Sequence, residues 1–296
     1  MVNNNSNIHA QRQGVTESDF SLIAAGDWGC DEKAQRTVMN IQNKKPDLVL
    51  ALGDLSYQKH ADCWFDMMGP LLNKTKIAIG DHEYHFKNSS RFKQYVDKFH
   101  LVNQYYSFNY ENIHFLGMSA EIPFDKNSKQ YKFVESDLKS ASSNTSIQWI
   151  IVFMYELIYS SPTFHTANEN LRDTYHPLFD KYHVDLVLQA HSHNYQRSFP
   201  ISYNDNKPSS PTINARDKEE YSDPKGSIFV VAGTGGADLH NFTGQEPYIV
   251  TQFQRFGFLK LDTIQNGTTL VGTFYENREA ANKDNFIITK SLKEEK

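Results

Sequence analysis

Three short hydrophobic runs in the first third of the chain end in the same way. They are FSLIAAGD (20–27), DLVLALGD (47–54) and TKIAIGD (75–81), so a continuous apolar run is followed each time by Gly-Asp. Continuous rather than alternating apolar runs are typical of strands that are covered on both faces. We therefore predict three buried strands, with an aspartate directly after each of them.

Residues 31–46, DEKAQRTVMNIQNKKP, join the first two runs and have the pattern of an amphipathic helix. Ala34, Val38 and Ile41 fall on one helical face, and Pro46 follows where the helix has to end. Strand, helix and strand in this order indicate a pair of parallel strands. Because the carboxyl ends of parallel strands gather at the ligand-binding edge of a sheet, we expect the three Gly-Asp pairs to converge.

The later part of the chain alternates helices with strands and then turns to hairpins. The pattern predicts helices over 91–100, 129–141 and 171–182, and strands over 104–119 (two strands around a turn), 146–154, 184–190, 227–236, 255–263, 268–276 and 286–290. Asn266-Gly267 is a strong hairpin signal between two of these strands. We predict one α/β domain with mixed sheets over 19–290, a polar N-terminal tail over 1–18 and an exposed insertion over 204–225.

Composition narrows the function classes. The chain has 296 residues, of which 39% are hydrophobic, and a formal net charge of −5. Binders of nucleic acids or membrane surfaces need a concentrated basic face, so we expect neither a nucleic-acid nor a membrane partner. No apolar run approaches the roughly 20 residues that span a bilayer. Cys30 and Cys63 either pair in an oxidising compartment or stay unpaired.

Side chains with metal-binding chemistry follow several of the predicted strands. They are Asp27 in GDWG, Asp54 and Tyr57 in GDLSY, Asp81 and His82 in GDHE, and His191 and His193 in AHSH. Carboxylates and a phenolate suit hard cations, whereas imidazoles suit Zn, Fe or Mn. Two neighbouring metal ions need a bridging carboxylate, and Asp54 is the candidate. Each motif alone is weak, because Gly-Asp after a strand is commonly just a turn, but four in this order predict a metal centre.

This order of motifs resembles the calcineurin-like metallophosphoesterase superfamily and, within it, the purple acid phosphatases. Their pattern is GDxG, GDxxY, GNH[DE], VxxH and GHxH, and the resemblance runs from about Phe20 to Tyr275. Tyr57 is the specific mark, since a tyrosine at this spacing supplies the phenolate ligand to ferric iron in that group. The resemblance implies a four-layer α/β/β/α sandwich, with the metals at the carboxyl edge of its sheets, and a small phosphate ester as substrate.

The resemblance also implies a dinuclear centre of Fe plus Zn, Mn or a second Fe. Its implied ligands are Asp27, Tyr57 and His193 for the first ion, Asp54 as the bridge, and Asp81, Tyr155 and His191 for the second. Two of these positions depart from the family pattern, which has asparagine at 81 and histidine at 155. Either the second metal site is repurposed, with carboxylate and phenolate ligands, or it no longer functions as a metal site. An added negative charge favours hard or trivalent ions over zinc and repels a phosphate dianion.

His82 and His165 are the candidate catalytic residues. His82 stands where the family contacts the phosphate or supports a ligand, and His165 lies in a loop where the family keeps histidines that bind substrate or protonate the leaving group. For His165 an exposed loop histidine is the equal alternative. The leading hypothesis is a purple-acid-phosphatase-like hydrolase of phosphate monoesters, with the family's attack by a metal-bound hydroxide. The alternative is a metal-binding homologue whose hydrolase activity is lost or much weakened by the altered second site.

Three further features leave alternatives open. Arg197 either holds a phosphate or pairs with a nearby acid, and the GTGG segment (233–236) either cradles phosphate or forms a tight turn beside the site. A disulfide between Cys30 and Cys63, bracing two loops near the metal edge, is our working hypothesis. The oligomeric state is open. The compartment is open too, with a secreted or extracytoplasmic protein whose signal peptide is not part of this chain as one alternative.

Overall fold

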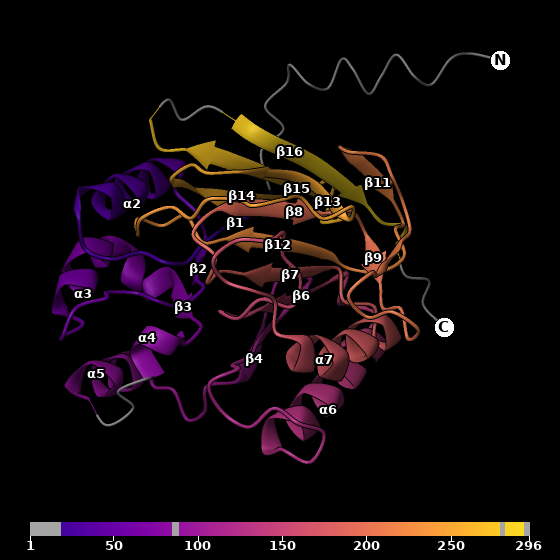
Figure 1. Cartoon of the computed structure of the whole chain (residues 1–296), viewed down its shortest axis with the longest axis horizontal. Helices are drawn as coiled ribbons and strands as arrows, with labels where there is room; N and C mark the ends of the chain where they lie inside the picture. Colours follow the sequence, from indigo (N-terminus) through magenta and orange to yellow (C-terminus); the bar gives the residue numbers. More distant parts are fainter. Residues whose placement is uncertain (1–18, 85–88, 279–281, 293–296) are drawn as a thin grey trace.

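Two seven-stranded mixed sheets pack face to face in the computed structural model, and helices cover their outer faces (Figure 1). The structure describes residues 19–84, 89–278 and 282–292. The polar tail that the sequence predicts over 1–18 lies outside the described residues. Since the layers follow the order α/β/β/α, the fold class predicted from the sequence is confirmed.

The first sheet contains the three strands that the Gly-Asp pattern predicts. In spatial order its strands are β11 (Glu220–Ser222), β16 (Asn282–Thr289), β15 (Thr269–Glu276), β14 (Gly257–Ile264), β1 (Phe20–Ala25), β2 (Leu48–Ala51) and β3 (Thr75–Ile77). The last three are parallel, and β14 to β16 are antiparallel neighbours. Asn266 and Gly267 both have positive φ, at 57° and 75°, in the turn between β14 and β15, so the predicted hairpin is confirmed.

The second sheet has a parallel centre and antiparallel margins. In spatial order its strands are β13 (Ile249–Phe253), β8 (Tyr195–Ser198), β12 (Ile228–Ala232), β7 (Leu186–Gln189), β6 (Trp149–Phe153), β5 (Ile113–Gly117) and β4 (Tyr106–Tyr110). The strands β5, β6, β7 and β12 run parallel. Their carboxyl ends therefore meet at one edge, as in the first sheet.

Amphipathic helices cover the two outer faces. Beside the first sheet lie α2 (Glu32–Lys44), α3 (Asp62–Met68), the 3-10 helix η2 (Gly69–Lys74), α4 (Asp81–Tyr84) and α5 (Ser90–Phe99), and beside the second lie α6 (Lys129–Ser143) and α7 (Glu169–Lys181) (Figure 1). Asp31 caps α2 by accepting hydrogen bonds from the backbone N–H groups of Lys33 and Ala34. The sequence prediction missed α3, because a seven-residue helix is too short to show a repeating hydrophobic period.

The largest apolar cluster fills the space between the sheets. Leu22, Leu50 and Phe115 belong to it, and each is fully buried. Side chains of β1 to β3 that point the other way pack against α2, α3 and α5 instead. Both faces of these strands are therefore covered, which explains their continuous apolar sequence.

The insertion predicted over 204–225 is mostly exposed, but part of it is ordered into strands. It contains β10 (Thr212–Ile213), which pairs with β9 (Ile201–Ser202), and the strand β11. The strand β11 pairs in parallel with β16 and so extends the first sheet by one strand. This pairing joins segments far apart in the chain, and it was not visible in the local sequence pattern.

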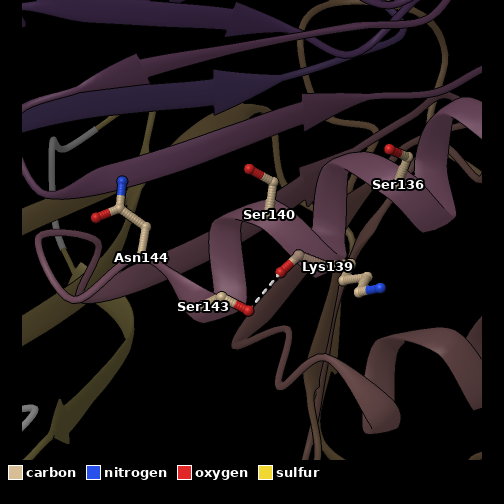
Figure 2. Close-up of a pocket in the computed structure, with 5 residues that line it drawn as sticks. All are labelled: Ser136, Lys139, Ser140, Ser143 and Asn144. Atoms are coloured by element: carbon tan, nitrogen blue, oxygen red, sulfur yellow. Dashed lines mark hydrogen bonds between the residues drawn. The ribbon is translucent and has the colours of Figure 1, made fainter. Parts of the chain in front are cut away.

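A surface cavity of about 500 Å³ lies along the second half of α6 (Figure 2). One helix and the turn after it supply its lining: Ser136, Lys139, Ser140, Ser143 and Asn144. Figure 2 shows these side chains spread along the helix rather than converging on one point. None of the residues that the sequence nominates for catalysis or metal binding lines this cavity.

The buried histidine of α7 is expected to make the stability of the protein depend on pH. His176 is fully buried, and its Nδ1 lies 2.9 Å from the hydroxyl of Tyr159. Burial lowers the pKa of His176 from 6.5 to about 3. As the pH falls, His176 therefore becomes protonated in the unfolded chain before it does in the folded protein. The contribution of His176 to the free energy of unfolding is therefore fully present above pH ~6.5 and falls by up to about 1.4 kcal/mol per pH unit below it.

The substitution His176→Phe should remove this contribution. Urea unfolding at pH 7 and at pH 5 measures it: the parent protein should lose about 2 kcal/mol more than the variant between the two pH values. An equal loss in both proteins would show that His176 is not the group that titrates.

Candidate metal centre

The loops after β1, β2, β3 and β7 meet at one edge of the two sheets. The backbone N–H of Asp27 donates to the carbonyl oxygen of Gly53 at 3.1 Å, and the N–H of Trp28 donates to that of Asp54 at 2.9 Å. The N–H of Gly26 donates to the carbonyl oxygen of Ala232 in the second sheet at 2.9 Å. These bonds join the loops directly, so the aspartates of the first two Gly-Asp pairs are brought together as predicted.

Four of the implied ligands have left-handed backbone conformations. The φ angles are 55° for Asp27, 50° for Asp54, 54° for Tyr57 and 65° for His191. Residues other than glycine rarely adopt positive φ, and such strain collects where a site has to aim its side chains. Loop geometry therefore supports the same residues that the motifs indicate.

The implied first-ion ligands form a compact triangle of donor atoms. The hydroxyl of Tyr57 lies 3.1 Å from Asp27 Oδ1 and 3.1 Å from His193 Nε2, and the third edge, from His193 Nε2 to Asp27 Oδ1, is 3.3 Å. Octahedral ions bound at about 2.1 Å separate neighbouring ligand atoms by about 3.0 Å. Asp27 Oδ2 is buried and has no hydrogen-bond partner among the described residues. The donor set and its spacing therefore fit a bound cation.

Glu83 holds the bridge loop in place. Its carboxylate, fully buried, accepts hydrogen bonds from the backbone N–H groups of Asp54 at 2.8 Å, Leu55 at 2.9 Å and Gly80 at 3.1 Å. Burial raises the pKa of Glu83 to about 6, against the lowering effect of these bonds. The acid that ends the GDHE motif is thus a positioning residue for Asp54.

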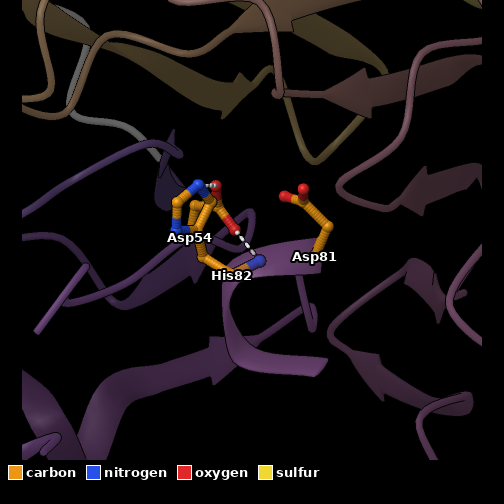
Figure 3. A group of neighbouring side chains, drawn as sticks. All are labelled: Asp54, Asp81 and His82. Carbon is orange, nitrogen blue, oxygen red and sulfur yellow. Dashed lines mark hydrogen bonds and ion pairs between the residues drawn. The ribbon is translucent and has the colours of Figure 1, made fainter. Parts of the chain in front are cut away.

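Asp54, Asp81 and His82 form a second close group (Figure 3). One ligand atom from each lies within 4.8 Å of the others. The backbone N–H of His82 donates to Asp54 Oδ1 at 3.1 Å, as the dashed line in Figure 3 shows, and its Nε2 lies 4.0 Å from Asp54 Oδ2. The pKa of Asp54 is raised by burial and by the nearby charges of Glu83, Asp27 and Asp81, which is the electrostatic environment that a cation relieves.

Tyr155 fills the space between two of the implied second-ion ligands. Its hydroxyl donates to Asp54 Oδ2 at 2.7 Å and lies 2.6 Å from His191 Nδ1. Gly53 permits this placement, because a Cβ there would lie 2.8 Å from Tyr155 Cδ2, and its φ of 98° also favours glycine. Burial and the charges of Asp27 and Asp54 raise the pKa of the Tyr155 hydroxyl far above its usual value when no cation is bound, as they also do for Tyr57.

Histidine rings form the wall of the site on the side of the second sheet. The ring of His165 lies 3.9 Å from that of His191, and burial lowers its pKa, with a further contribution from His193. The ring of His240 stacks on that of His193 at 3.9 Å and lies 5.0 Å from that of His165. Sequence reasoning placed His165 here but missed His240, because His240 belongs to no motif and reaches the site through a loop after GTGG.

The three features that the sequence left open have definite places in the fold. Arg197 makes a buried two-point ion pair with Asp284, with Nε to Oδ2 at 2.6 Å and Nη2 to Oδ1 at 2.8 Å, so it pairs with an acid. The GTGG segment lies against the loop after β1, since the N–H of Gly235 donates to the carbonyl oxygen of Gly26 at 2.8 Å and the N–H of Gly236 to that of Asp27 at 3.0 Å. Cys30 and Cys63 form a disulfide, which confirms the working hypothesis.

The chain is similar to several known proteins. The family model described as "Calcineurin-like phosphoesterase" matches residues 9–195. "Probable inactive purple acid phosphatase 1" of Arabidopsis thaliana is 26% identical over 281 residues, which cover 85% of this chain and 44% of that protein. "Purple acid phosphatase 15" of the same plant is 26% identical over 275 residues, covering 78% and 48%. The chain thus spans about half the length of these curated relatives.

A solved structure shows the same fold. The purple acid phosphatase PPD1 from yellow lupin (Lupinus luteus) seeds superimposes with a TM-score of 0.80 at 22% identity, covering 92% of this chain and 54% of that one. In the described part of the chain, no helix is long and apolar enough to cross a membrane.

Proposed function

Because the chain belongs to the calcineurin-like phosphoesterase family, we propose that it is a metal-dependent hydrolase of phosphate monoesters of the purple acid phosphatase type. The observation that carries this proposal is the triangle of Asp27 Oδ1, Tyr57 Oη and His193 Nε2, with edges of 3.1, 3.1 and 3.3 Å. Asp54 lies beside it as the candidate bridge. Metal ions held here would activate water near neutral pH and offset the charge that develops on the phosphoryl group.

The chain's own residues would bind and orient the ester. The ring of His82 lies 4.5 Å from that of Tyr57 and its side chain is half exposed, so it can reach a phosphate oxygen at the mouth of the site. The ring of His165 lies 3.9 Å from that of His191, and at acidic pH its protonated form would donate a proton to a leaving-group oxygen. Glu83 and the disulfide between Cys30 and Cys63 hold the loops that carry these groups.

Elemental analysis combined with an assay on 4-nitrophenyl phosphate tests the proposal. Protein loaded with iron, zinc or manganese should bind at least one equivalent of metal and release 4-nitrophenolate. Metal binding without release of phosphate, across several metals and pH values, would contradict hydrolysis and leave metal binding intact.

A second candidate function is supported by Tyr155. Its hydroxyl is hydrogen-bonded both to Asp54 Oδ2 and to His191 Nδ1, where the family pattern has a histidine ligand. A phenol hydrogen-bonded to both of these groups would compete with a second metal ion for them. The second candidate function is therefore that of a metal-binding homologue whose hydrolase activity is lost or much weakened.

The identity of the first ion can be tested through Tyr57. If ferric iron occupies the triangle, the phenolate of Tyr57 should give a charge-transfer band in the visible range, and Tyr57→Phe should abolish it. Tyr106→Phe is the matched control, because Tyr106 is a half-buried tyrosine whose hydroxyl hydrogen-bonds to the backbone of Ile77, away from the metal centre. A band that survives Tyr57→Phe would exclude this phenolate as an iron ligand, and the absence of any band in the iron-loaded protein would leave zinc or manganese.

The disulfide between Cys30 and Cys63 indicates the kind of compartment in which the protein resides. Disulfides persist in oxidising environments, and the Cys30–Cys63 bond links the loop after β1 to α3 next to the metal centre. We extend the proposal to a secreted or extracytoplasmic protein.

A further inference from the structure

A separate polar cavity lies beside the loop that supports the metal centre. Its volume is about 540 Å³, and α2, the segment 254–256, the end of β15 and the start of β16 form its walls. The charged side chains that line it are Lys33, Arg36, Arg255, Arg278 and Lys283 against Glu32 and Glu276. We call this cavity the basic pocket, because its lining is cationic although the chain carries a net charge of −5.

The acidic side chains that line the basic pocket do not neutralise all of its positive charge. The carboxylate of Glu276 is 9% exposed and already bound on both sides, by Arg255 Nε at 3.2 Å and by Lys283 Nζ at 3.2 Å. Arg36 and Arg278 are exposed and make no ion pair with any residue that the structure describes. Two guanidinium groups are therefore free to bind a ligand.

The lining indicates the chemistry of that ligand. Guanidinium groups bind tetrahedral oxyanions with paired, charge-assisted hydrogen bonds, and several cations in one cavity favour an anion with more than one negative charge. The volume exceeds that of a single phosphate ion and falls in the range of small-molecule sites. Leu239 and Phe256 add an apolar part to the wall. We propose that the basic pocket binds phosphoryl groups, either of a polyphosphate or of a phosphorylated organic molecule.

One loop separates the basic pocket from the metal centre. On the pocket side, Lys33 Nζ lies 2.6 Å from Asp238 Oδ1, and Leu239 lines the cavity. On the other side, His193 Nδ1 donates to the carbonyl oxygen of Asp238 at 2.7 Å, and His240 stacks on the ring of His193. A phosphorylated ligand in the pocket would thus contact the lysine that holds this loop. The proposal goes beyond phosphoester hydrolysis and does not depend on it.

Isothermal titration calorimetry on the full chain tests the proposal, with tripolyphosphate and glucose 6-phosphate as probes. The titrations are run in excess chelator, on the Asp54→Asn variant as well as on the parent, so that phosphate bound through metal ions does not contribute. Adding Arg36→Ala and Arg278→Ala should weaken the binding of the preferred probe about tenfold, because each removes charged hydrogen bonds. The matched control, Lys129→Ala with Lys132→Ala on the exposed side of α6, should stay within about twofold.

The two probes distinguish the sources of the phosphoryl group. Tighter binding of tripolyphosphate would assign the pocket to polyphosphates, and tighter binding of glucose 6-phosphate would assign it to phosphorylated organic molecules. The proposal is overturned if neither probe binds to the Asp54→Asn protein, or if the pocket variant binds as tightly as its parent. Failure of the parent to hydrolyse 4-nitrophenyl phosphate affects neither result.

Discussion

The double substitution Tyr155→His with Asp81→Asn is expected to raise the metal content from one equivalent to two and to increase hydrolysis of 4-nitrophenyl phosphate by at least about tenfold. In the parent, the Tyr155 hydroxyl lies 2.7 Å from Asp54 Oδ2 and 2.6 Å from His191 Nδ1, so it occupies two donor atoms that a second ion would need. Histidine is smaller and supplies an imidazole ligand in the same place, and asparagine removes one of the charges around Asp54. A second ion held by these residues would supply charge stabilisation for phosphoryl transfer.

Three variants make this prediction specific. Tyr155→Phe removes the hydroxyl without adding a ligand, so it should free Asp54 and His191 and yet gain little activity. Tyr155→His and Asp81→Asn alone should each give part of the gain, because the two positions face the same bridge residue and their effects are coupled. Metal content is measured by elemental analysis and turnover by initial rates in the same samples. A high parental activity that falls in the double variant would show instead that Asp81 and Tyr155 are a repurposed ligand set.

The sequence predicts most of the fold because its signals are local. The strands β1, β2 and β3 were recognised from continuous apolar runs, and the helix α2 from its apolar face and its end. The pairing of β11 with β16 could not be recognised in this way, because it joins two short segments whose contact is set by the packing of the whole sheet. The short helix α3 was missed for the opposite reason, since its seven residues carry too little pattern.

In the candidate site, too, local motifs were recognised from the sequence and long-range contacts were not. The motifs indicate which residues approach the edge of the sheets, and the structure brings Asp27, Tyr57 and His193 within 3.3 Å of one another. What they do not indicate is the contact between Tyr155 and Asp54, which are 101 residues apart in the chain. The stacking of His240 on His193 is equally invisible, because it depends on the path of the loop after GTGG. Contacts of this kind follow from tertiary packing, not from residue order.

Removing the charge of the bridge carboxylate is expected to have two opposite effects. The substitution Asp54→Asn should weaken the binding of every ion held at this centre and reduce any hydrolysis by at least about a thousandfold, because Asp54 is the candidate bridge between the two metal positions. The same substitution should stabilise the metal-free protein. Burial and the charges of Glu83, Asp27 and Asp81 raise the pKa of Asp54, so its ionised form is disfavoured when no cation is present.

Asparagine keeps the size of the side chain and an oxygen that can accept from the N–H of His82, so the comparison isolates the charge. Thermal unfolding in excess chelator should show Tm of the Asp54→Asn protein a few degrees above that of the parent, whereas a given concentration of metal should stabilise the parent more than the variant. Asp97→Asn on the exposed side of α5 is the control and should leave Tm and metal content unchanged. If the metal-free Asp54→Asn protein were less stable than the metal-free parent, the Asp54 carboxylate would be shown to stabilise the fold. The expected opposite result would mean that the acids around Asp54 are kept for a cation at the expense of stability.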